Sequence, residues 1–515
     1  MIGAGHNGLI CACYLARAGL DVLVLEQAEH VGGAVWTEET VPGFRFDTHA
    51  VAHNMINMTD IPRDLRLDEC GLEYLPLDPF TTALSPGGPP FRLYRDLDRT
   101  CDDIARTNSA EARAYARFVR TLQPLVAAAL EVMAASSCTD RLKALPGQAL
   151  NLARMLRRLG PAGLASTLAA PYRRLLDEYL PSERLRAPIA ALAAHATVGP
   201  DQPGGSFYAI WQAAYHLSGM WHPRGGSGSL ALALERRLVS LGGRVRTGAD
   251  VARIELRRGR VAGVTLRSGE KIAARTVVAA INPKIALLDL LPPGVAAERL
   301  LQRVRATTIS NAVQFVVHVA LTELPAYRAV PGDDAWNGMA AMTRDVAQVG
   351  RAFAQAVAGE APDDPPVYAF TPSAIDGSLA PPGRHTLYLA CPAYPYRFAD
   401  GSRWRDVAQR EAERLVTAME PYAPCLRDRI LAVMPRTPAQ AEQEIRLVGG
   451  HPMHLDLTPD QLLFLRPLPG LGRYRTPLPG LYLSGAGTNP AGGVIGSPGR
   501  NAAWRVLGDL HITRM

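Results

Sequence analysis

The first strong pattern of apolar positions lies near the start of the chain. From Asn7 the segment NGLICACYLARAG carries apolar residues at helical spacing and ends at Gly19, a residue that suits the position just after a helix. The run DVLVLE, residues 21–26, has the continuous apolar character of a short buried strand and ends in an acid. This pattern predicts a helix followed by a strand.

Glycines accompany this predicted pair in the spacing G-x-G-x-x-G, at Gly3, Gly5 and Gly8. Such glycines let backbone N–H groups approach a dinucleotide pyrophosphate at the helix N-terminus, and an acid ending the next strand, here Glu26, accepts ribose hydroxyls. A merely solvated glutamate is the alternative for Glu26. Gly32 and Gly33, six and seven residues after that acid, offer a second place where the backbone can approach a ligand closely. The segment therefore predicts a dinucleotide site.

The strand expected before the glycine turn is almost missing, because only two residues precede Gly3. In this fold the first strand is central and buried on both faces. We expect the true start to lie upstream, with Met1 standing at a valine codon that was read as an initiator.

A strand pattern recurs near the end of the chain. A last strand is predicted at 480–485, and it leads through a glycine-rich turn into a helix. Residues 141–240 show Leu, Ala and Arg at helical spacing, and no second glycine fingerprint follows a strand. We therefore expect no built-in NAD(P)H site.

Composition narrows the class of protein. A chain of 515 residues with 48% apolar and 20% charged residues predicts a globular enzyme of two or three domains. The net charge of +7 rests on arginine, with lysine only at Lys143, Lys271 and Lys284, which is typical of a GC-rich genome; we expect no nucleic acid partner. The seven cysteines form no C-x-x-C pair, which favours a reducing cytoplasm over disulfides or zinc.

The sequence resembles the FAD-dependent phytoene desaturase-like oxidoreductases. This family includes bacterial carotenoid desaturases, desaturase-like β-carotene ketolases and the pyridine nucleotide-disulfide oxidoreductase domain-containing group. The resemblance covers the whole chain and rests on the segments GAGHNG, LEQAEHVGGAV, PGFRFDTHA, GGSGSLALALERRL, VVAAINP, GGHPMHLDLTPDQLLFLRP and LYLSGAGTNPAGGVIGSPGRNAA.

The resemblance implies an α/β fold in which a discontinuous FAD-binding domain, Rossmann-like and of the glutathione reductase type, alternates with an α+β substrate domain. The FAD-binding parts would be 1–85, 225–290 and 475–515. A helical, membrane-facing substrate part would span 86–224, and the rest of the substrate domain 291–474.

The resemblance also assigns FAD contacts in the second and third FAD-binding parts. The backbone at Val251 would contact the adenine. After the last strand, the positive end of the following helix would face the flavin pyrimidine, where reduced flavin carries negative charge. These later cofactor-binding positions are Gly485, Gly487, Gly493 and Val494.

Catalytic side chains are expected to be few, because a flavin takes a hydride from a well-oriented C–H bond with little help. The candidates are His454 and Asp460, beside Gln461, whose imidazole and carboxylate would take the second proton. Asp460 follows Thr458 and Pro459, so a helix-capping role is the alternative.

Other histidines are better explained without catalysis. His49 and His53 are expected to be structural rather than to face the flavin ring, and His6, His49 and His53 offer no defensible chelating geometry, so we expect no metal.

Positive charge gathers without acids along 141–174, interleaved with Leu and Ala at helical spacing. This face suits either solvent or an anionic bilayer from which a lipophilic substrate would enter. The expected location is the cytoplasm, with a possible peripheral contact on the inner face of the membrane. No run of eighteen uncharged apolar residues is present to span it.

Three functions stay open at this point. The first is dehydrogenation or another oxidation of a lipophilic isoprenoid or polyene by hydride transfer to FAD, with oxygen or a quinone as external electron acceptor. The second is oxidation of a small biosynthetic intermediate or amine. The third is a flavoprotein with a binding or regulatory role. A long apolar tunnel favours the first, and a short polar cage the second.

Overall fold

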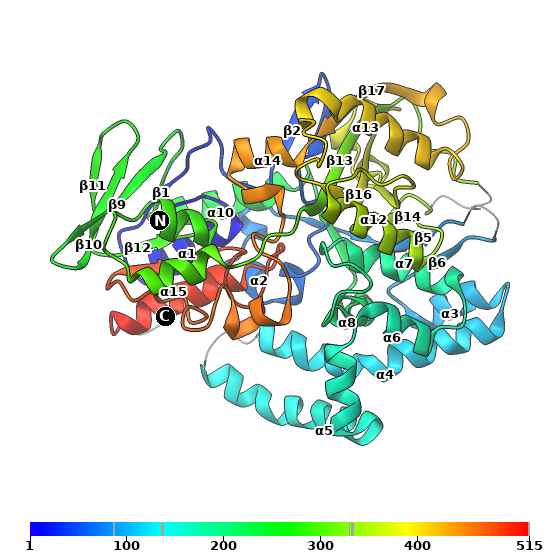
Figure 1. Ribbon diagram of the computed structural model, residues 1–515, viewed down its shortest axis with the longest axis horizontal. Coiled ribbons are helices and arrows are strands. Elements are labelled where there is room, and N and C mark those ends of the chain that lie inside the picture. Colours follow the sequence, from blue (N-terminus) through cyan, green and yellow to red (C-terminus); the bar gives the residue numbers. More distant parts are fainter. Residues whose placement is uncertain (86–87, 135–137, 329, 331–333, 513–515) are drawn as a thin grey trace.

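A computed structural model describes residues 1–85, 88–134, 138–328, 330 and 334–512. The side chains at 131–148, 151, 152, 155 and 158 lie outside this description. They include the basic side chains of Arg141, Lys143 and Arg158. The fold is mixed α/β. One lobe holds both marked ends of the chain, and the other holds a larger sheet with helices below it (Figure 1).

The first lobe is built around a parallel sheet from distant segments. β1 (Leu23–Leu25) pairs with β8 (Arg244–Arg246), and β12 (Val277–Ala279) pairs with β18 (Leu481–Leu483). Ile2 lies between the two pairs, with parallel bridges to Leu25 and to Ala279. Residues 1–3 thus occupy the central place of the sheet, where the sequence predicts a strand.

The predicted helix after the glycine turn is confirmed. It forms α1 (His6–Arg17), in which every residue except Arg17 is buried. Apolar residues cover all its faces because it contacts two other helices, α10 (Gly228–Ser240) and α15 (Ser497–Asp509). The predicted strand after it is the buried β1.

Three smaller antiparallel units lie outside the two main sheets. One is a three-stranded sheet that protrudes at the edge of the first lobe (Figure 1), one is a hairpin, and one joins segments far apart in the sequence. Their strands are β9 (Val251–Arg257), β10 (Arg260–Leu266) and β11 (Lys271–Ala273); β2 (Thr37–Val41) and β3 (Phe44–Asp47); and β4 (Tyr74–Leu77) with β7 (Met220–Pro223).

The second lobe contains a seven-stranded mixed sheet. Its strands, in spatial order, are β17 (Ile430–Arg436), β13 (Ala312–Leu321), β16 (His385–Pro395), β15 (Val367–Phe370), β14 (Met339–Met342), β5 (Thr81–Ala83) and β6 (Phe91–Leu93). β5 falls within the part that the sequence assigned to FAD, 1–85. It pairs instead with β6 and β14 of this sheet, because its three residues are buried on both faces there.

Helices fill the space around and below this sheet (Figure 1). They are α3 (Leu97–Ala105), α4 (Ser109–Ala134), α5 (Cys138–Ala169), α6 (Tyr172–Tyr179), α7 (Glu183–Ala194), α8 (Ser206–Ile210), α9 (Gln212–Ser218), α12 (Val346–Ala358), α13 (Trp404–Met419) and α14 (Pro438–Ile445). Two further helices, α2 (Ile61–Asp64) and α11 (Glu298–Arg305), pack in the first lobe instead. Between 138 and 240 the described residues form helices and the single strand β7, so the predicted helical character is confirmed.

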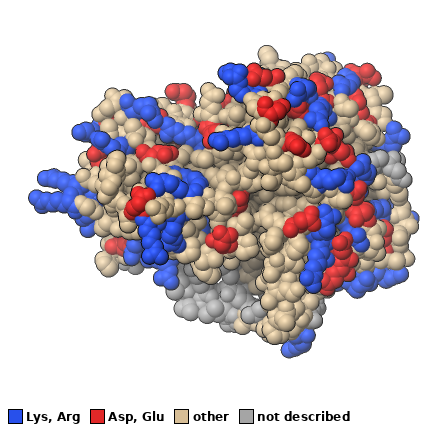
Figure 2. Space-filling view, viewed as in Figure 1, with Lys and Arg blue, Asp and Glu red and all other residues tan. Residues whose placement is uncertain are grey.

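The described surface mixes both signs of charge. Lys and Arg side chains are interspersed with Asp and Glu over both lobes rather than gathered in one patch on this face (Figure 2). Within the described ranges, no helix has both the length and the hydropathy needed to cross a membrane.

Candidate functional site

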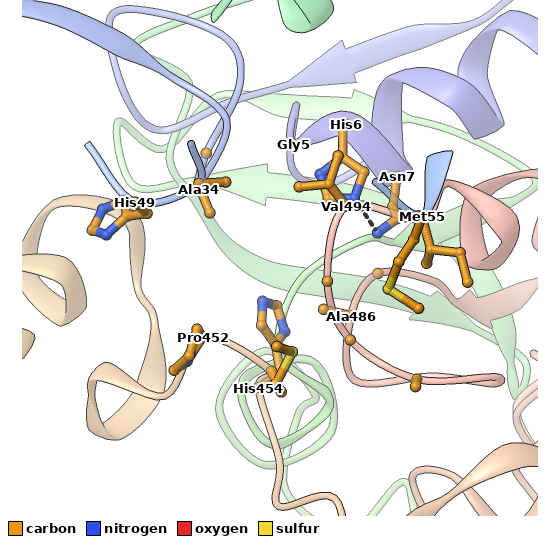
Figure 3. A pocket seen from close by; sticks show the side chains of 18 of the residues that line it. Gly5, His6, Asn7, Ala34, His49, Met55, Pro452, His454, Ala486 and Val494 are labelled. Atoms are coloured by element: carbon orange, nitrogen blue, oxygen red, sulfur yellow. Dashed lines mark hydrogen bonds between the residues drawn. The ribbon is translucent and has the colours of Figure 1, made fainter. Parts of the chain in front are cut away.

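A cavity of about 910 Å³ lies between the two lobes and reaches both sheets. Its wall combines the glycine turn before α1, the end of β1, the start of β9, helices α7 to α9, strands β13 to β15 and the loops 445–464 and 485–501. Figure 3 shows the part near α1, with His6 and Asn7 on one side of the view and His454 on the other. Segments from one end of the chain to the other therefore meet at one site.

One end of the cavity is formed by the glycine turn and Glu26. The N–H of Ala4 donates to Glu26 Oε2 at 2.7 Å, and the N–H of Ala28 donates to Glu26 Oε1 at 3.0 Å. Glu26, Gly3 and Gly5 all line the cavity. A carboxylate oxygen accepts more than one hydrogen bond, so Glu26 can hold the turn and still accept from a ligand hydroxyl.

Close backbone packing explains the other predicted glycines of this turn. A Cβ on Gly8 would lie 2.2 Å from the carbonyl oxygen of Gly3, so Gly8 lets α1 start tightly against the turn although it does not itself line the cavity. Gly32 has a φ of +120° and forms a bridge to Gly5, and Gly33 lines the cavity beside it. These positions leave room for a ligand against bare backbone.

Val251 also lines this end, next to an ion pair that the sequence did not reveal. Asp250 Oδ2 accepts from Arg267 Nε at 2.8 Å and from Arg446 Nη2 at 2.7 Å. Asp250 and Arg446 line the cavity with Glu26. Since Asp250 and Arg446 are 196 residues apart in the sequence, no local pattern could have paired them.

The C-terminal glycines surround the middle of the cavity. Gly485 and Gly493 have φ values of +90° and +100°, and both line the cavity with Val494. Gly487 does not line it; a Cβ there would lie 2.3 Å from Pro283 Cδ, so this glycine serves close packing. The first residue of α15, Ser497, lines the cavity, which directs the positive helix N-terminus toward it.

The first residues of α1 face the same space and were missed from the sequence. His6 and Asn7 line the cavity and are joined side chain to side chain at 3.0 Å, the dashed contact in Figure 3. Burial lowers the pKa of His6 to about 4, so its imidazole is neutral at physiological pH. Two helix N-termini, α1 and α15, thus point at one cavity.

Of the two catalytic candidates, only His454 faces the cavity. It has a φ of +66°, a conformation rare outside glycine, and its carbonyl accepts from Asn282 Nδ2 at 2.9 Å. Its Nδ1 is buried without a hydrogen-bond partner among the described residues, and burial lowers its pKa to about 3.

Asp460 and Gln461 occupy other places. Asp460 is exposed in a short 3-10 helix, Pro459–Gln461, and does not line the cavity. Gln461 is buried, and its Oε1 accepts the N–H of Thr308 at 2.9 Å, so it supports the loop.

A fully buried guanidinium, Arg466, holds the loop that carries His454. It donates to five backbone carbonyls, those of Met453, Leu455 (3.3 Å), Asp456 (3.1 Å), Gln461 (2.9 Å) and Ala486 (3.0 Å). Burial lowers its pKa to about 10, which still leaves it charged at neutral pH. This side chain ties the 453–461 loop to the glycine-rich C-terminal segment.

The two histidines after β3 differ. His53 contacts Ser227 Oγ at 2.6 Å and the Tyr74 hydroxyl at 3.2 Å, so both ring nitrogens have partners and the residue does not line the cavity. His49 does line it, and burial lowers its pKa to about 3.

The far end of the cavity is an apolar chamber. The only Asp, Glu, Lys or Arg side chains on the described cavity wall are Glu26, Asp250 and Arg446, all at the end formed by the glycine turn. The chamber wall is rich in aromatic side chains that the sequence analysis did not single out. They are Phe207, Tyr208, Trp211, Tyr215 and Phe370.

A glycine turn opening a helix, an acid ending the next parallel strand and a second helix N-terminus on the same cavity are typical of a dinucleotide-binding protein. Residues 8–319 match the model of the flavin-containing amine oxidoreductases, and the chain belongs to that family. It is an FAD-dependent oxidoreductase, and its residues fit FAD: bare glycine backbone, an acid with free acceptor capacity and a roomy cavity.

Three known proteins show how far the similarity extends. The mouse pyridine nucleotide-disulfide oxidoreductase domain-containing protein 2 is 32% identical, covering 99% of this chain and 93% of its own. A lycopene-forming phytoene desaturase from Pantoea ananas is 26% identical, covering 99% of each chain. A structure of putrescine oxidase with putrescine bound superposes with a TM-score of 0.62 at 15% identity, covering 99% of this chain and 98% of the other. The resemblance predicted from the sequence is confirmed.

Proposed function

We propose that the parallel sheet and its helices form a discontinuous FAD-binding domain of the Rossmann-like, glutathione reductase type. Gly3, Gly5, Gly32 and Gly33 would face the pyrophosphate, and Glu26 the adenosine ribose. Val251 would contact the adenine, and Gly485, Gly493 and Val494 the flavin ring. The packing of Gly8 and Gly487 supports indirect roles, since both allow the turns to approach.

We further propose that the enzyme dehydrogenates a neutral, lipophilic small molecule of the isoprenoid or polyene type. The observation that carries this proposal is the chamber, whose described wall is aromatic and aliphatic and has no charged side chain. A protonated amine would enter without a carboxylate to pair it, and burying an unpaired charge is costly. The similarity to a phytoene desaturase over nearly the whole chain supports the same substrate class.

Bound FAD supplies the acceptor for a hydride from a C–H bond of the substrate. The chain orients the substrate between the aromatic side chains and excludes water from the chamber. His454, with its pKa lowered to about 3, is too weak a base to hold the second proton near pH 7. We propose that it orients the substrate as a neutral imidazole. Asp460 has no part in this step, because it is exposed outside the cavity. The second proton is released to solvent, and an external acceptor, oxygen or a quinone, takes the two electrons that arrived with the hydride.

Anaerobic mixing of the FAD-loaded enzyme with substrates tests the proposal. A neutral isoprenoid should bleach the flavin absorbance band, and a primary amine of the same chain length should not. Leu192→Asp, which places a charge on the chamber wall, should slow bleaching by the isoprenoid. Leu217→Asp, at an exposed position outside the cavity, is the matched control. Fast bleaching by the amine alone would overturn the neutral-substrate assignment.

We also propose a peripheral contact between α5 and an anionic membrane on the inner face. Three leucines of α5 are exposed, Leu150, Leu156 and Leu168, and Arg154 and Arg157 are exposed on the same helix. Phe464, 69% exposed, lies at the cavity wall and would meet a lipophilic substrate there. The protein should co-sediment with anionic vesicles at low salt and release as salt rises. Equal binding to neutral vesicles, or no binding, would contradict the contact.

A further inference from the structure

The apolar chamber contains one amide whose hydrogen bonds are incomplete. Gln314, on β13, lines the cavity, and its Nε2 donates to the hydroxyl of Tyr388 on β16 at 3.0 Å and to the hydroxyl of Tyr368 on β15. Its Oε1 has no hydrogen-bond partner among the described residues. An amide oxygen accepts up to two hydrogen bonds, so this acceptor is unused.

The hydrogen bonds of the neighbouring tyrosines fix which end of the Gln314 side-chain amide is oxygen and which is nitrogen. The Tyr388 hydroxyl donates its single proton to the carbonyl oxygen of His49 at 2.9 Å, so toward Gln314 it can only accept. The group that faces Tyr388 must therefore be the NH₂ of Gln314 and not its oxygen. With both N–H groups bound by tyrosine oxygens, Oε1 stays as an acceptor on the cavity wall.

A second unpartnered polar group lies against the same tyrosine. His195, which follows α7 and lines the cavity, has its ring centroid 5.1 Å from that of Tyr368. Neither ring nitrogen has a partner among the described residues, and Nδ1 is buried. Burial lowers the pKa of His195 to about 4, so the ring is neutral and carries one donor and one acceptor.

We propose that His195 and Gln314 form a subsite for a hydroxyl group of the substrate. A hydroxyl donates its proton to Gln314 Oε1 and accepts from an N–H of His195, so this one group pairs with both residues. A ketone or ether cannot donate to Gln314, and a hydrocarbon leaves both residues unpaired, at a cost that a buried polar group always carries. A carboxylate would meet the amide oxygen, and no described cation lines this end. The substrate is thus a hydroxylated neutral lipid.

This inference rests on the proposed function in treating the chamber as the substrate site, and it names the polar group there. Three isoprenoids of equal length, ending in a hydroxyl, a methyl ether or a plain carbon, test it on the FAD-loaded enzyme. Their dissociation constants are read from the change in the flavin spectrum on binding. The alcohol should bind about tenfold or more tightly than the other two, because it alone forms a hydrogen bond with both residues.

Two variants locate the effect, and a third controls for changes in the chamber wall. Gln314→Leu and His195→Phe should each bring the alcohol close to the affinity of the hydrocarbon, and His195→Phe keeps a ring against Tyr368. Met339→Leu, at an apolar position of the same sheet and cavity, should leave the preference intact. Each variant is compared at equal FAD content, so a folding defect in one leaves the other informative.

The outcomes separate this inference from the proposed function. Equal binding of alcohol and hydrocarbon by the unmodified enzyme, or an alcohol preference that survives both variants, overturns the hydroxyl subsite. If the hydrocarbon bleaches the flavin and the alcohol is not preferred, the hydroxyl subsite is overturned but the proposed function still holds. A preference for the alcohol without bleaching by any neutral lipid supports the subsite and overturns the proposed reaction.

Discussion

Replacing Glu26 by alanine removes a carboxylate that holds two backbone N–H groups. Ala4, one of the donors, is fully buried, whereas Ala28 is half-buried and water can replace its partner. A buried donor left unpaired costs about 1–3 kcal/mol, and the half-buried one adds about 0.5–1 kcal/mol. Glu26→Ala should therefore lower the free energy of unfolding of the apoprotein by about 1.5–4 kcal/mol, out of a typical total of roughly 5–15 kcal/mol.

The same change should weaken FAD binding separately. A hydrogen bond to a charged acceptor contributes about 1.5–3 kcal/mol, so losing one ribose contact raises the Kd of FAD roughly tenfold to a hundredfold. At an FAD concentration far above Kd, a hundredfold loss of affinity also removes about 2.7 kcal/mol of the stabilisation that FAD provides.

Fluorescence titration of the apoprotein with FAD gives the affinity, and thermal unfolding with and without FAD gives the two stability changes. Glu26→Gln, which keeps one acceptor for Ala4, should lie between the unmodified protein and Glu26→Ala. Glu29→Ala, at an exposed neighbouring acid, is the matched control. If Glu26→Ala matches Glu29→Ala in both measurements, Glu26 neither holds the turn nor binds the ribose.

Three further predictions follow from the structure. NADH and NADPH should fail to bleach the flavin rapidly in anaerobic mixing, since the described residues between 138 and 240 form no second parallel nucleotide fold; fast bleaching would contradict this. Burial lowers the pKa of His195 from 6.5 to about 4 and that of His454 from 6.5 to about 3. As the pH falls below 6.5, these histidines take up protons in the unfolded chain before they do so in the folded protein. The free energy of unfolding should therefore decrease as the pH falls through this range. Urea unfolding at several pH values measures this, and His195→Phe should flatten the slope between pH 6.5 and 4; an unchanged slope would refute it. Arg466→Met should lower the melting temperature and FAD content severely because five carbonyls lose their donor, with Arg466→Lys intermediate; near-normal melting of the Met variant would count against that role.

The end of the cavity formed by the glycine turn and Glu26 was predictable because the sequence signals for it are local. Glycine spacing, a helix and an acid within the first 33 residues are set by backbone geometry, and the structure places α1, β1 and the Glu26 contacts accordingly. The chamber was not predictable in this way. Gln314, Tyr368 and Tyr388 come from three strands, with sequence separations of 54 and 74 residues, and none stands out in composition.

Two other positions show why local patterns are ambiguous. The segment around Asp460 fits both a catalytic acid and a helix start, and only tertiary structure places the side chain outside the cavity. The three-residue strand β5 has no periodicity to assign it, so its membership of the seven-stranded sheet depended on partners far along the chain.

The parallel sheet of the first lobe sets the order of events during synthesis. Its strands end near residues 3, 25, 246, 279 and 483, so the central positions wait for partners made hundreds of residues later. Such non-local pairing slows folding, because the entropy cost of closing long loops comes before the stabilising contacts form. Gly5 and Gly493 come to line one cavity only after almost the whole chain has left the ribosome. Until then the growing chain exposes apolar strand edges, and its dependence on chaperones should end when the last strand docks.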